Sequence, residues 1–163
     1  MFKVVDDFLN GTTMYRLVLY VLIVLVVAAT ALSFAKLLPF DPVALLFSAA
    51  FLIAVCWVTN TIFSKVFKAP TNLESVYITA LILVLIVTPT KIVGDLPSLF
   101  WVAVLAQASK YILNIGGKHI FNPAAFAVTI TAVVLNNGAS WWVGTSWMMP
   151  FTAIGGVLIL RKI

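Results

Sequence analysis

Two long apolar stretches without a charged residue constrain this chain more than any other feature of its sequence. One lies between Arg16 and Lys36, and the other lies between Asp41 and Lys65. Apolar stretches of roughly 18 residues or more are typical of helices that cross a bilayer, and the first is too long for the core of a signal peptide, which has about 7–15 residues. Charged residues make up only 9% of the chain, against roughly 25% in soluble domains. The sequence therefore predicts an all-helical, polytopic membrane protein.

Shorter apolar segments extend this prediction to about six transmembrane helices in a single domain, residues 1–163. Residues 1–12 are mixed in polarity, and we expect them to form a leader at the membrane surface. The helical bundle would then occupy residues 13–163. The six expected helices cover approximately residues 13–38, 42–63, 71–88, 97–114, 122–135 and 147–160.

Three of these helices have recognisable start signals. Asp41-Pro42 and Asn122-Pro123 each place a favoured N-cap residue before a proline in the first helical position. Thr71-Asn72-Leu73-Glu74 has the pattern of a capping box, which predicts Thr71 as the N-cap. The third helix then has about 17 residues and the fifth about 13, fewer than the ~20 needed to cross the hydrocarbon core. We expect both to be short or discontinuous helices supported by their neighbours.

The distribution of basic residues orients the bundle. With the N-terminus in the cytoplasm, the inner segments hold eight basic residues and the outer segments hold two, which fits the positive-inside rule. The inner residues are Lys3, Arg16, Lys65, Lys68, Lys110, Lys118, Arg161 and Lys162, and the outer residues are Lys36 and Lys91. The tryptophans expected at the outer interface are Trp101, Trp141, Trp142 and Trp147. The sequence thus predicts a multi-pass protein of the inner (plasma) membrane with both termini cytoplasmic.

The most polar passage of the chain runs from Lys110 to Val128, across the junction of the fourth and fifth expected helices. It contains Lys118, His119 and Asn122, the residue expected to cap the fifth helix. The positive end of a helix dipole beside a lysine and a histidine is a ready site for an anion, such as a phosphate or an anionic reduced flavin. The plainer interpretation is that the lysine sets the topology, His119 lies at the interface and Asn122 is only a cap.

A second polar feature lies on one face of the fourth expected helix. Four residues follow the spacing i, i+3, i+4, i+7, which places them together. They are Gln107, Lys110, Tyr111 and Asn114. Such a face is costly in lipid, so it should line a protein interior, a cavity or the interface. Alternatively, Lys110 reaches the interface and Gln107 bonds to a neighbouring helix.

The rarity of titratable side chains excludes several chemistries. Cys56 is the single cysteine and His119 the single histidine, so a disulfide, a metal cluster or a Ser-His-Asp triad cannot be assembled. The net charge of +5 comes from basic residues between apolar segments, as in membrane proteins, and does not indicate nucleic-acid binding. We predict no catalytic residue, no metal site, no nucleic-acid partner and no self-contained active site.

The segment Gly117–Phe126, Gly-Lys-His-Ile-Phe-Asn-Pro-Ala-Ala-Phe, resembles the NqrB/RnfD family of redox-driven membrane pump subunits. Members of this family belong to the sodium-pumping NADH:quinone reductase (Nqr) and to the Rnf electron-transport complex. The resemblance extends over roughly residues 70–163, while the preceding residues match only in hydropathy. It implies a flavin-bearing subunit that passes electrons inside a complex and couples them to Na+ or H+ movement. Its partners would be the other subunits of an Rnf/Nqr-type complex and the lipid bilayer.

The same resemblance implies how a flavin would bind. Family members carry FMN on the threonine of a Ser-Gly-Ala-Thr motif, and Gly138-Ala139-Ser140 lacks that threonine. In the family this motif lies beyond the length of the present chain, which therefore resembles an N-terminal half, completed by a C-terminal half or by a second copy. We expect FMN or riboflavin to bind non-covalently. The expected contacts are Lys118, His119 and Asn122 for the flavin or its phosphate, and Gln107, Asn114 and Thr79 for the adjoining cavity.

Three other classes of protein stay open. The segment His119–Ala124 also resembles the Asn-Pro-Ala box of aquaporins, and six helices would suit a channel. A water channel needs two such boxes and a selectivity arginine after the second, and this sequence has one box and no arginine in that place. A small-solute transporter of the urea-transporter type shares the discontinuous helices. A structural scaffold is also compatible, but it leaves the polar face of residues 107–114 unexplained.

Overall fold

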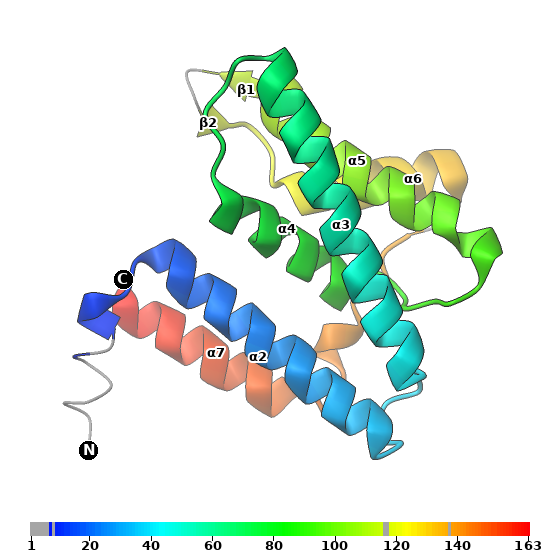
Figure 1. Ribbon diagram of the computed structural model, residues 1–163. Helices are drawn as coiled ribbons and strands as arrows, with labels where there is room; N and C mark the ends of the chain where they lie inside the picture. The colour runs from blue at the N-terminus through cyan, green and yellow to red at the C-terminus, as the bar shows by residue number, and fades with distance from the viewer. Residues whose placement is uncertain (1–6, 8, 116–117, 137) are drawn as a thin grey trace.

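The computed structural model describes residues 7, 9–115, 118–136 and 138–163 and is almost entirely helical (Figure 1). Its helices are α2 (Met14–Phe34), α3 (Pro42–Val66), α4 (Leu73–Ile86), α5 (Leu96–Ile112), α6 (Pro123–Leu135) and α7 (Met149–Lys162), with the 3₁₀ turns η1 (Val93–Asp95) and η2 (Trp142–Gly144). Between α5 and α6, the two-residue strands β1 (Asn114–Ile115) and β2 (Lys118–His119) pair antiparallel. Apart from this ladder, the prediction of an all-helical chain is confirmed. Most of the expected leader, residues 1–12, lies outside the described residues.

Two of the predicted helix starts are confirmed. The Asp41 side chain accepts a hydrogen bond from the Val43 N–H, and α3 begins at Pro42. The Asn122 side chain accepts hydrogen bonds from the N–H groups of Ala124 and Ala125, and α6 begins at Pro123. Both caps satisfy backbone donors that a helix start leaves without partners.

The predicted start of the third helix is wrong by one residue. Asn72, and not Thr71, is the N-cap of α4, and its side chain accepts from the Ser75 N–H at 3.2 Å. Asn is at least as good a cap as Thr, so the local competition favours it. The helix then ends at Ile86 after 14 residues, shorter than the expected length of about 17. At 1.5 Å per residue α4 is about 21 Å long, and α6, with 13 residues, is as short as predicted.

Helix α4 lies at the centre of the bundle and contacts α2, α3, α5 and α6 (Figure 1). Its residues are apolar around most of the circumference, and most of them are buried, as expected for a helix surrounded by protein. Helix α7 packs against α2, and α6 packs against α5. The order of packing across the bundle is therefore α7, α2, α4, α3, α5 and α6.

Successive helices run in opposite directions between two ends of the bundle. At one end, which we call the basic end, α2 and α4 begin and α3 and α5 finish. There Arg16 of α2 contacts Glu74 of α4, and Lys110 of α5 contacts Ser75 of α4. At the other end, which we call the tryptophan end, Ser48 near the start of α3 exchanges two hydrogen bonds with the backbone of Thr90, just after α4.

The tryptophan end of α4 is closed by residues 140–142. The carbonyl of Ile86 accepts from the N–H groups of Ser140 and Trp141. The indole N–H of Trp142 donates to the carbonyls of Val84 and Val87 at 3.2 and 3.0 Å. Trp142 was expected at the outer interface, but its side chain is buried at 3% exposure. The segment thus supplies donors that the last carbonyls of α4 lack within the helix.

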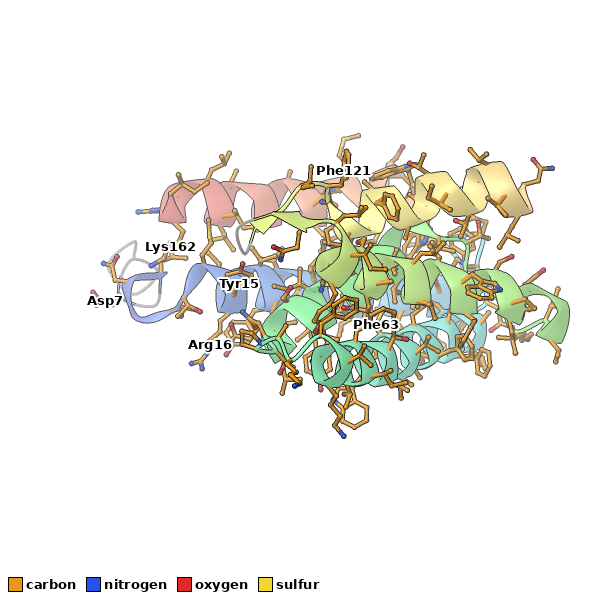
Figure 2. All side chains as sticks on the ribbon, turned by 90° about the horizontal axis from the view of Figure 1, so that it is seen from above. Asp7, Tyr15, Arg16, Phe63, Phe121 and Lys162 are labelled. Atoms are coloured by element: carbon orange, nitrogen blue, oxygen red, sulfur yellow. The ribbon has the colours of Figure 1, made fainter. Side chains whose placement is uncertain are left out.

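The pair of α2 and α7 is held by a close approach at Gly155. A Cβ atom at this position would lie 2.5 Å from Cγ1 of Val21 in α2, so only glycine fits without a shift. The Lys162 ammonium donates to the carbonyl of Leu9. Figure 2 shows Arg16 and Lys162 at the same end of the molecule.

Two helices, α2 and α3, are long and apolar enough to cross a membrane, whereas α4 and α6 are apolar but shorter. In the most apolar part of α2, only 22% of the residues are buried inside the protein. Large apolar side chains on other helices are exposed as well, including Val133 and Val134 of α6. An apolar exterior of this kind is typical of a protein whose surroundings are lipid.

Candidate polar site

A polar cavity of about 480 Å³ opens at the basic end. Figure 1 shows the helices around this end, where α3 and α5 finish and α4 begins. Its volume is within the range of roughly 300–1,000 Å³ that is usual for small-molecule sites. The residues that line it are Asn60, Phe67, Ala69, Pro70, Asn72, Ser75, Lys110, Tyr111 and Asn114. Three asparagines, a serine, a tyrosine and a lysine offer both hydrogen-bond donors and acceptors here.

Lys110 is the single charged residue of this lining and is buried, with 7% of its surface exposed. Its ammonium donates to the carbonyl oxygen of Ser75 at 2.9 Å and to the Ser75 hydroxyl at 3.2 Å. Lys110 takes part in neither the ion pair of Arg16 with Glu74 nor that of Lys91 with Asp41. Glu74, the neighbouring acid on α4, is bound by Arg16 at 2.9 Å. The buried ammonium is thus hydrogen-bonded but is not neutralised by an acidic side chain of the described part.

One wall of the cavity combines a hydrogen bond with an aromatic cluster. The hydroxyl of Tyr111 donates to Oδ1 of Asn60 at 2.7 Å, which links α5 to α3. The rings of Phe63, Phe67 and Tyr111 stack with centroids 5.8–5.9 Å apart. Figure 2 shows Phe63 on the ribbon of α3. The cavity therefore presents a flat aromatic surface close to polar groups.

Gln107, one turn before Lys110, is fully buried and is not part of the cavity lining. Neither its amide oxygen nor its amide nitrogen has a hydrogen-bond partner among the described residues. The thiol of Cys56 lies close to the Gln107 amide, but the hydrogen bond that it forms goes to the carbonyl of Ala103 at 4.0 Å. Two unpaired polar atoms in an apolar interior are costly, since each loses its water without a replacement.

The structure brings together only part of the predicted flavin contacts. Asn114 lines the cavity, in β1 rather than in the helix, and donates to the carbonyl of Lys110. Thr79 is buried outside the cavity, and its hydroxyl donates to the carbonyl of Ser75 in its own helix. Asn122 is exposed and caps α6. For Lys118 and His119 only the backbone in β2 is described, and their side chains lie outside the described part.

The polar side chains that were predicted to share one face lie in the protein interior or line the cavity, two of the settings expected for them. Gln107 points into the protein interior, while Lys110, Tyr111 and Asn114 line the cavity. Sequence reasoning missed Asn60, which is buried near the end of α3. An asparagine in an otherwise apolar helix was the available signal, since buried polar groups in such helices generally bind a partner.

Among the described residues, no group of three or more His, Cys, Asp or Glu side chains is arranged to hold a metal ion. Comparisons with protein-family models, with curated proteins and with solved structures find no match for this chain. Its function is therefore inferred from the residues of the site.

Proposed function

We propose that this chain is a polytopic membrane subunit of a flavin-dependent, ion-translocating electron-transport complex of the Rnf or Nqr type. In this proposal the six helices α2 to α7 cross or partly cross the inner (plasma) membrane, with the basic end in the cytoplasm. The subunit would carry electrons by way of FMN or riboflavin, bound without a covalent link, and work with the other subunits of the complex.

The alternation of helix direction supports the membrane part of the proposal. Arg16, Lys65 and Lys110 belong to three different helices, yet all three are at the same end of the bundle. Basic side chains gathered at one end, with an apolar exterior between the two ends, match the positive-inside rule. Helices α4 and α6 are too short to span the ~30 Å hydrocarbon core alone, and neighbours pack around α4 on several sides.

The cavity at Lys110 is the observation that carries the flavin part. It combines a buried cation, several amide and hydroxyl groups and a stacked aromatic cluster in a volume suited to a small molecule. These groups fit a flavin, since a planar ring system can stack on Phe67 and Tyr111 while polar side chains bind its hydroxyl-bearing chain. When bound, the flavin would supply one- and two-electron transfer. The chain's own residues would bind it, orient it and hold a cation near it.

Absorbance and fluorescence spectra of the detergent-purified chain, recorded before and after acid precipitation, test this proposal. We expect a flavin spectrum and release of the flavin into the acid supernatant, because no covalent link is expected. The variant Asn60→Ala should lose flavin, and Asn10→Ala, which changes an exposed asparagine before α2, should keep it. A folded protein without any flavin, even after incubation with FMN and riboflavin, would contradict the proposal. Uptake of water and urea into liposomes would then test the channel and transporter classes.

A further inference from the structure

We propose that the cavity at the basic end is a receptor for a phosphoryl group, with Lys110 as the residue that binds its negative charge. The phosphoryl group belongs either to the headgroup of an anionic lipid or to a soluble ligand such as FMN. This inference depends on the proposed function only for the second source, because a lipid headgroup would occupy the site whether or not the protein carries a flavin.

The hydrogen-bonding capacity of Lys110 is the first argument. A lysine ammonium has three N–H donors, and two of them bind Ser75 through its carbonyl and its hydroxyl. Among the described residues no hydrogen bond to a third acceptor is formed, and the side chain lines an open cavity that a ligand can enter. A donor on a buried cation is costly to leave without an acceptor, so the site favours a ligand that brings one.

Charge balance is the second argument. A buried cation normally has an anionic partner nearby. The acid next to Ser75 is Glu74, which is bound to Arg16 on the α2 side. Of the other described acids, Asp7 is exposed before α2, and Asp41 and Asp95 are at the tryptophan end of the bundle. The position of Lys110 in the last turn of α5 gives it some favourable interaction with the helix dipole, but a full negative charge is still lacking among the described groups.

The remaining polar lining favours an oxyanion over a simple halide. The side-chain amides of Asn72 and Asn114 and the hydroxyl of Ser75 lie around the same cavity as Lys110. Amide N–H and hydroxyl groups can donate to several oxygens of one phosphoryl group at the same time. The cavity is also at the end of the bundle where lipid headgroups would lie in the proposed topology, and basic pockets between helices on that side are typical sites for anionic headgroups.

Riboflavin and FMN form a matched pair of probes, because they differ only by the phosphoryl group. We expect the purified full chain to bind FMN about tenfold or more tightly than riboflavin, a ratio typical of one charge-assisted hydrogen bond. The variant Lys110→Gln should remove this preference, and Lys110→Arg should retain it. Lys65→Gln removes the same charge from an exposed position at the same end and should change nothing. Inorganic phosphate should displace FMN from the wild-type protein but should leave riboflavin bound.

The lipid source is tested by native mass spectrometry of the same four proteins in nanodiscs, with phosphatidylcholine alone or mixed with phosphatidylglycerol. Phosphatidylglycerol retained by the wild type, Lys110→Arg and Lys65→Gln, but lost from Lys110→Gln, would identify a headgroup as the ligand. If phosphatidylglycerol binds in this pattern and neither flavin binds, the phosphoryl receptor stands and the flavin proposal fails. If Lys110→Gln retains as much phosphoryl ligand as the wild type, or the wild type binds none of these probes, the inference is overturned. The phosphate displacement arm needs no variant, so it stays decisive if Lys110→Gln fails to fold.

Discussion

The two ends of helix α4 differ in how completely the surrounding residues use their polar groups. At the tryptophan end, backbone and indole N–H groups of residues 140–142 bind the last carbonyls of the helix, and Trp142 fills the space beside them. At the basic end, the first turn of α4 faces a polar cavity, and its Ser75 carbonyl is bound by a lysine from another helix. One end is therefore organised for stability, whereas the other keeps unused polar groups that a ligand can bind.

Removing the indole of Trp142 should have the largest effect on this difference between the ends, because it removes the side chain that closes the tryptophan end of α4. The variant Trp142→Ala loses a fully packed ring and leaves carbonyls at the end of α4 without their donor, so we expect a loss of about 3–5 kcal/mol in the free energy of unfolding. Chemical unfolding in detergent, followed by far-UV circular dichroism, measures it. Trp147→Ala, at an exposed position in the same segment, is the matched control and should cost far less. Equal losses in the two variants would show that residues 140–142 do not close the helix.

The Ser48 hydroxyl provides a smaller test of the same end. It both donates to the Thr90 carbonyl and accepts from the Thr90 N–H at 2.9 Å, and it is buried. Ser48→Ala should lower the free energy of unfolding by about 1–3 kcal/mol, because a buried N–H and carbonyl lose their partner. The exposed Ser146→Ala variant serves as the control in the same unfolding assay. A neutral Ser48→Ala variant would mean that water replaces the hydroxyl at this end.

At the basic end, replacing the polar side chain of Lys110 should not lower the free energy of unfolding in the same way. Lys110→Met removes a buried charge that no acidic side chain of the described residues neutralises, so we expect the free energy of unfolding without ligand to stay within about 1 kcal/mol of the wild type or to rise. The same variant should lose phosphoryl binding, which separates function from stability at this site. Lys65→Met controls for the loss of charge at an exposed position. A large loss of stability in Lys110→Met would show that the basic end, like the tryptophan end, is organised for stability.

The smallest expected effect concerns pH at the tryptophan end. The hydrogen bond from Lys91, followed by the one from the Val43 N–H, lowers the pKa of the Asp41 carboxyl below its ordinary value. A carboxyl whose pKa is lower in the folded state stabilises the fold above its ordinary pKa of roughly 4 and loses this contribution as pH falls through the lower folded value. Asp41→Asn keeps the helix cap and removes the charge. Unfolding measured across the acid range should therefore depend less on pH in Asp41→Asn than in the wild type, and identical profiles would contradict the role of this pair.

Features of the fold that depend on residues within one helical turn could be predicted from the sequence, whereas features that depend on distant residues could not. The starts of α3 and α6 were predicted, because an N-cap and the proline after it act within one turn of helix. The start of α4 was missed by one residue, since Thr71 and Asn72 are both good caps and only the folded chain shows which one binds the Ser75 N–H. Burial of Trp142 was not predictable, because it depends on a contact with α4, 55–58 positions away in the chain.

In the candidate site, too, local features could be predicted and long-range contacts could not. The spacing of Gln107, Lys110 and Tyr111 predicted a polar face on one helix, and that face is turned to the interior and the cavity. The partner Asn60 is 51 positions away from Tyr111 and comes from α3, so no local pattern links the two residues. The expected participation of Lys118 and His119 in the site stays a prediction.

The close spacing of α2 and α7 depends on residue 155 having no Cβ atom. In the proposed membrane setting, association of helices gains little from burying apolar surface, so it depends on how closely two backbones approach. A methyl group at position 155 would act as a wedge against Val21, because the two atoms would be only 2.5 Å apart. The neighbouring Gly156 has no atom within 4 Å of such a methyl group. Two adjacent glycines of identical chemistry therefore differ in what they contribute: Gly155 is required for the close contact of the helices, whereas Gly156 is half-buried with open space beside it.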